Sequence, residues 1–256
     1  MPSVSHLPDA VFESRDFRTF HGHFVRLPEI RFYAVLLLIA AIAAVWLATN
    51  VWELLLPIVG IAIFYPFFEY VLHRWVLHNA LLCRTPITAR IWWRLHYRHH
   101  SAPRDAAVIL GAPWTLLVAV AVGSLLTASV YWSLAALATA TAASLAAAII
   151  YEYFHSLEHS RVELRSPYLL RMRQHHLAHH HLTDHHNFGI ATDFVDRLVG
   201  TSAAADKSLQ RSPTVYNLGY TDDVAENYPW VEKIEREVGP PPRTAGLGET
   251  RAPDPT

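Results

Sequence analysis

The chain has 256 residues, of which 52% are apolar, and its formal net charge is −1. This near-neutral charge gives no reason to expect a nucleic-acid partner, and the apolar content is high for a water-soluble domain. The single cysteine, Cys83, excludes an intramolecular disulfide framework and a cysteine-rich zinc site. Histidine is the unusual residue, because there are 17 of them against 21 lysines and arginines together.

Two long apolar stretches follow a polar N-terminal segment, residues 1–31, in which we expect no cleaved signal peptide. Glu53 is the only charged residue from 32 to 68, and none occurs from 106 to 151. A membrane-spanning helix needs about 20 apolar residues, so each stretch is long enough for two. Polar and aromatic residues interrupt both stretches near the middle. We therefore predict four membrane helices in two hairpins, near 32–49, 53–72, 107–128 and 132–152.

Basic residues are expected on only one side of these helices. Neither hairpin turn contains lysine or arginine, whereas arginines precede the first hairpin, connect the two hairpins and follow the second. The positive-inside rule makes that side, with both termini, cytoplasmic. Two buried hairpins in a soluble protein are the rival interpretation, which the charge asymmetry disfavours.

The expected fold class is an all-α integral membrane protein. Residues 32–201 would form a membrane domain of four transmembrane helices with a cytoplasmic, histidine-rich helical cap. Residues 202–256 would form a polar tail, with a helix-like run at 230–238 and a disordered end.

Most histidines fall in four clusters at or beyond the ends of the predicted helices. An even number of crossings separates the clusters, so all four should meet at one face. Residues three or four apart share a helix face, and most of these histidines have that spacing. His73 and His78 are five apart, so we expect the helix to end or unwind at His78. The clustered imidazoles outnumber the roughly four to six ligands that one metal ion binds, so they suit two ions. These candidate ligands are His73, His78, His96, His99, His100, His155, His159, His176, His179 and His180.

The identity of the metal does not follow from imidazole alone, which binds zinc, copper, iron and nickel. A metal transporter would place polar ligands inside the spanning helices, near the midplane. The predicted spanning segments contain no histidine and almost no carboxylate. This disfavours transport, although a non-catalytic metal-binding protein remains an alternative.

The order H-x-x-x-x-H, H-x-x-H-H, H-x-x-x-H, H-x-x-H-H resembles the fatty acid hydroxylase/sterol desaturase superfamily. The resemblance covers roughly residues 60–201, including Phe68-Glu-Tyr-Val-Leu-His73-Arg and a closing segment at 187–201. It is closest to the fatty acid 2-hydroxylase branch, in which ten histidines of this pattern bind two metals. It implies a di-iron site, in which zinc can replace iron, that uses dioxygen to hydroxylate a fatty acyl chain or sterol-like lipid.

The resemblance also implies a bilayer setting and a separate electron donor, either a ferredoxin or a b-type cytochrome. The fused cytochrome of some relatives carries a His-Pro-Gly-Gly motif that is absent here, so no haem is expected. Desaturases and carotenoid hydroxylases share the scaffold and remain alternatives. The three-residue gap between His155 and His159 argues mildly against the carotenoid branch.

Several residues lie near the pattern but outside it. Glu69, His175 and Asp196 are candidates for orienting a ligand imidazole. Glu158 is expected to be an exposed charge. The remaining neighbours are additional ligands, orienting groups or surface residues: Asp184, His181, His185 and His186.

Overall fold

The computed structural model describes residues 7–103, 105–109, 113–203 and 210–238. All regular structure within these ranges is helical. Three helices are long and apolar enough to cross a membrane: Pro28–Leu47 (α3), Trp52–Leu77 (α4 and its continuation η2) and Leu134–His159 (α9). The α4 segment itself ends at Val71, and η2 covers Leu72–Leu77.

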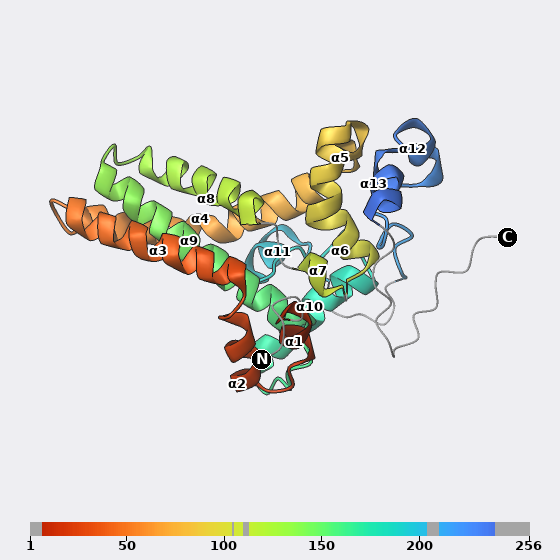
Figure 1. Ribbon diagram of the computed structural model, residues 1–256, viewed down its shortest axis with the longest axis horizontal. Helices are drawn as coiled ribbons and strands as arrows, with labels where there is room; N and C mark the ends of the chain where they lie inside the picture. Colours follow the sequence, from red (N-terminus) through yellow and green to blue (C-terminus); the bar gives the residue numbers. More distant parts are fainter. Residues whose placement is uncertain (1–6, 104, 110–112, 204–209, 239–256) are drawn as a thin grey trace.

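The long helices lie side by side in an elongated bundle (Figure 1). The α9 helix packs against α3, α4 and a fourth apolar helix, Pro113–Ala128 (α8). The outer faces carry large apolar side chains, such as Leu38, Ile42 and Ile63, each about 60% exposed. Apolar surface on this scale is unfavourable in water and stable against hydrocarbon. The helices therefore fit a membrane protein.

The fourth predicted crossing stays a prediction. The α8 helix has 16 residues, fewer than the roughly 20 that a crossing needs. A separate short helix, Ala106–Ile109 (α7), occupies the start of the predicted 107–128 helix, and residues 110–112 lie outside the described part of the chain. The α9 helix runs seven residues past its predicted end at 152, so His155 and His159 belong to it.

Short elements gather at one end of the bundle (Figure 1). Most of the histidines lie in these elements. Two of the elements are the small helices α1 and α2, and α2 packs Phe20 and Phe24 against Tyr153 of α9. Their bounds are Leu7–Glu13 (α1), Phe17–Phe24 (α2), Ala80–Arg84 (η3), Pro86–Trp92 (α5), Trp93–Tyr97 (η4), Arg98–Ser101 (α6), Pro167–His181 (α10) and Phe194–Val199 (α11).

Residues 210–238 fold against this end of the molecule. They contain Asp222–Asn227 (α12) and Trp230–Val238 (α13), and α13 coincides with the predicted helix-like run. Val231, Ile234 and Leu218 form a core with Trp92 and Cys83. The predicted disordered end, 240–256, lies outside the described residues.

Candidate metal centre

A π-helical turn brings His73 and His78 together. In η2 the His78 amide donates to the His73 carbonyl at 3.1 Å, an i→i+5 bond that widens the helix. The two ring centroids are consequently 5.0 Å apart. His78 caps η2, so the helix does end there, as the five-residue spacing predicts.

All ten predicted histidines lie in two adjacent groups of five. Within each group, one nitrogen of every imidazole lies within 4.8 Å of the others. The two groups are contiguous, because the ring centroids of His100 and His180 are 4.3 Å apart. The first group is His73, His78, His96, His100 and His179, and the second group is His99, His155, His159, His176 and His180.

Backbone carbonyls orient three imidazoles of the first group. The Nδ1 atoms of His73, His100 and His179 lie 2.5, 2.9 and 2.7 Å from the carbonyl oxygens of Phe188, Val215 and His186. A carbonyl oxygen only accepts hydrogen bonds, so each Nδ1 carries the proton and donates it. Each Nε2 then presents a lone pair, which is the form that binds a metal.

The donor set fits a cation. The buried Nε2 atoms of His73 and His100 have no hydrogen-bond partner among the described residues. His179 Nε2 also carries a lone pair, and it lies 3.0 Å from His78 Nε2. In the second group, His159 and His176 bring their Nε2 atoms to 2.8 Å. Lone pairs that converge in a dry site are stable when a metal ion lies between them.

Burial keeps these imidazoles neutral. It lowers the pKa of His100 to about 3, and it holds the pKa values of His176 and His180 well below their usual range. A neutral imidazole is required of a metal ligand, because the proton and the metal compete for the same lone pair. The site is therefore ready to bind a metal at physiological pH.

Glu158 is buried, and the expectation of an exposed charge is wrong. Only 3% of the Glu158 surface is exposed. The reason is that α9 continues to His159, which keeps position 158 packed inside the protein. Glu158 Oε2 lies 3.9 Å from Nδ1 of His176, which is itself buried. The carboxyl group thus faces Nδ1 of His176, but at a distance longer than the hydrogen bonds that carbonyls accept in the first group.

Two carboxylates hold the segment that supports His73. Asp196 accepts hydrogen bonds from the amides of Phe188 and Gly189, at 3.0 and 2.7 Å, and lies 3.2 Å from His175 Nε2. Burial raises the pKa of Asp196, but these donors outweigh burial and keep that pKa below its ordinary value. Glu69 accepts from the Ile190 amide at 2.6 Å.

The two carboxylates fix the backbone that presents the Phe188 carbonyl to His73, and His175 bonds to one of them. A role for Glu69, Asp196 and His175 in orienting a ligand imidazole stays a prediction.

The other neighbouring histidines lie outside both groups. His185 is exposed beside Asp184, and His181 faces the Tyr216 hydroxyl at 3.4 Å. His186 contributes its carbonyl rather than its ring. This carbonyl and those of Phe188 and Val215 could not be predicted from the sequence, because a backbone group leaves no signal in side-chain type. Glu158 did carry a signal, since it lies directly before a histidine of a ligand-spaced pair.

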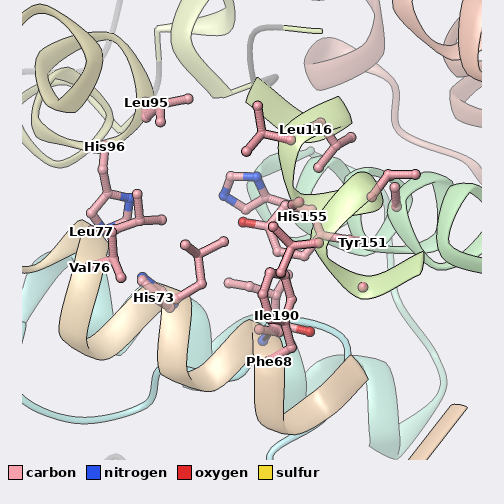
Figure 2. A pocket seen from close by; sticks show the side chains of 18 of the residues that line it. Phe68, His73, Val76, Leu77, Leu95, His96, Leu116, Tyr151, His155 and Ile190 are labelled. Carbon is pink, nitrogen blue, oxygen red and sulfur yellow. Dashed lines mark hydrogen bonds between the residues drawn. The ribbon is translucent and has the colours of Figure 1, made fainter. Parts of the chain in front are cut away.

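A cavity of about 530 Å³ adjoins both groups. Figure 2 shows His73 and His96 of the first group and His155 of the second at this cavity. Its other walls are mainly apolar side chains of α4, α8 and α9. Val118 of α8, which is 60% exposed, lies at the edge, so the cavity reaches the apolar outer surface of the bundle. This size and lining are typical of a small-molecule site.

Comparisons with known proteins match the part of the chain that carries all ten histidines. A sequence profile described as fatty acid hydroxylase matches residues 58–201, more than half of the chain. The fatty acid 2-hydroxylase of Mus musculus is 27% identical over 140 residues, which are 52% of this chain and 36% of the mouse protein. The chain thus matches about a third of the length of that relative.

A solved structure has a similar fold. It is described as full-length Scs7p with only the hydroxylase domain visible. The TM-score is 0.61 at 21% sequence identity, and the match covers 78% of this chain and 71% of that one.

Proposed function

This chain belongs to the fatty acid hydroxylase family, and we propose that it hydroxylates a C–H bond of a lipid with dioxygen at a di-iron centre. The observation that carries the proposal is the pair of five-histidine groups beside one apolar cavity. Two adjacent ions would lie at the wall of the cavity, and the cavity would hold the hydrocarbon part of the lipid.

The residues of the chain have three tasks in this reaction. The ten imidazoles would hold the ions, and carbonyls such as that of Val215 would keep Nε2 atoms directed at them. The apolar walls would exclude water and hold the lipid beside His73, His96 and His155. When bound, iron would supply the redox chemistry that lets dioxygen attack an unactivated C–H bond, whereas zinc has no redox chemistry.

The membrane setting supplies the remaining partners. We propose that the lipid enters the cavity from the bilayer past α8, where Val118 is exposed. Electrons would come from a separate ferredoxin or b-type cytochrome. The donor would dock on the cytoplasmic side, where the positive-inside rule places the arginine-rich segments and the histidines.

Lipid analysis tests the proposal. The chain is expressed with an electron donor, and host lipids are compared by mass spectrometry with those from a His176→Ala, His179→Ala variant, which damages both groups. We expect one lipid class to gain a single oxygen atom only in the presence of the intact chain. Loss of two hydrogens would indicate desaturation instead. Metal flux or storage without any lipid product would contradict an enzymatic role.

A further inference from the structure

One part of the cavity wall is polar, and it lies on the membrane side of the histidines. Tyr65 and Glu69 of α4, and Tyr151 and Glu152 of α9, line it. A helix rises about 1.5 Å per residue, so Glu69 lies roughly 6 Å along α4 from His73. Tyr65 lies about twice as far from His73. Figure 2 shows Tyr151 near His155 at the cavity.

The two glutamates are buried deeply, and the two tyrosines are half-buried. Glu69 is 6% exposed and Glu152 is 2% exposed. Glu69 Oε1 accepts the Ile190 amide, whereas its buried Oε2 has no hydrogen-bond partner among the described residues. Ser144 Oγ, further along the same wall, has none there either. A buried polar atom without a partner is unfavourable, and a ligand that hydrogen-bonds to it removes that cost.

The charges of the cavity wall limit what such a ligand is. No lysine or arginine occurs among the described residues that line the cavity. Away from the histidines, a substrate carboxylate or phosphate would therefore find no lysine or arginine and would face two glutamates. Elsewhere the wall is apolar, with side chains such as Leu77, Leu82 and Leu95.

We propose that this polar wall is a subsite for an uncharged hydrogen-bonding group, such as a hydroxyl, on an otherwise apolar substrate. The subsite consists of Tyr65, Glu69, Tyr151 and Glu152. The inference rests on the proposed function, because it names the chemical class of lipid for that site. The hydrocarbon part of the substrate fills the apolar remainder of the cavity.

Binding of matched lipids tests the subsite. The full chain is reconstituted in nanodiscs, and binding of radiolabelled octadecan-1-ol is measured in competition with octadecane, octadecanoate and octadecylamine. We expect the alcohol to bind roughly tenfold or more tightly than octadecane, which offers no hydrogen bond, and than octadecanoate, which would face the two glutamates. The amine should not bind more tightly than the alcohol. This measurement needs no turnover.

Two hydroxyl deletions locate the contact. Tyr65→Phe and Tyr151→Phe each remove one oxygen atom from the wall. Each should weaken alcohol binding about three- to tenfold and leave octadecane binding unchanged. Tyr153→Phe is the matched control, because Tyr153 also lies on α9 but packs against Phe20 and Phe24 outside this cavity. Its alcohol binding should stay unchanged.

Several outcomes would overturn the subsite. They are equal binding of alcohol and alkane, tighter binding of the carboxylate or the amine, or equal losses for alcohol and alkane in both tyrosine variants. If one tyrosine variant does not fold, the other variant and the lipid series on the unmodified chain still decide. Alcohol preference without any lipid oxidation would contradict the proposed function and leave the subsite standing.

Discussion

The orientation of each candidate ligand depends on the group that faces its second ring nitrogen. His73, His100 and His179 face backbone carbonyls, which no side-chain substitution removes. His176 faces the Glu158 carboxylate. Glu158 is therefore the residue at which this support is most directly tested by mutation.

Glu158→Gln should weaken metal binding. The change replaces the carboxyl group that faces His176 with an amide that can point its donor at Nδ1. Groups of this kind typically change metal affinity about 10- to 100-fold, and we expect a loss in that range. Competition with a chelator, followed by elemental analysis, measures it. Glu163→Gln, which changes an exposed glutamate nearby, is the control. Equal chelator sensitivity of both variants would contradict the role of Glu158.

At the scale of elements, the segment from Asn187 to Thr201 supports the first group through its backbone. Gly189 lies where a Cβ atom would come within 2.1 Å of the Thr192 carbonyl and 3.0 Å of Asp196 Oδ2. Any larger residue must displace the loop. Because the Phe188 carbonyl precedes this glycine, the displacement reaches His73 directly.

Gly189→Ala should consequently reduce the metal content of the purified protein. We expect the first group to lose its ion and the second group to be filled only partly, because the two groups take histidines from the same segments. Elemental analysis should show at most about half the metal of the unmodified chain. Gly22→Ala is the control, because a Cβ at Gly22 meets nothing within 4 Å. Full metal content in Gly189→Ala would refute this account.

The sequence predicted the elements that depend on local periodicity. Three- and four-residue spacings identified the histidines of α6, α9 and α10, because an α-helix places such residues on one face. The π-turn of η2 was predicted only as a place where the helix ends or unwinds, since the sequence does not specify an i→i+5 bond. The burial of Glu158 was missed because it depends on how far α9 extends. The contact of Val215 with His100 was missed because it joins residues far apart in sequence.

At the scale of the molecule, the C-terminal part supports a site that lies elsewhere in the chain. The family match ends at residue 201, yet the Val215 carbonyl accepts a hydrogen bond from His100. Val231 and Ile234 also cover Trp92, in the helix directly before the His96 segment. Residues 210–238 thus support the histidine site through contacts with His100 and Trp92.

Truncation after Thr201 should therefore lower the metal content of the purified protein. His100 would lose the acceptor of its Nδ1 proton, and Trp92 would become exposed. We expect lower yield and at least a severalfold gain in chelator sensitivity. Truncation after Val238 keeps every described contact and serves as the comparison. Equal metal retention in the two truncated chains would show that the 210–238 region is dispensable.

Acidification should destabilise the protein. The pKa of His100 is about 3 in the folded chain against an ordinary value of 6.5. Between these values the unfolded chain binds more protons, so stability is complete above about pH 6.5 and falls as the pH decreases. We expect Tm and metal content to fall together as the pH is lowered from about 7 to about 5. His185→Ala, at an exposed histidine, should leave that profile unchanged.

The two histidine groups share their supporting helices. The segment from Trp93 to Ser101 gives His96 and His100 to one group and His99 to the other, and α10 likewise gives His179 to one and His176 and His180 to the other. An ion that orders either segment therefore lowers the entropy cost of forming the neighbouring site. Loading should be cooperative, with a sigmoidal titration and few singly occupied molecules. Each half of the centre acts as an effector of the other.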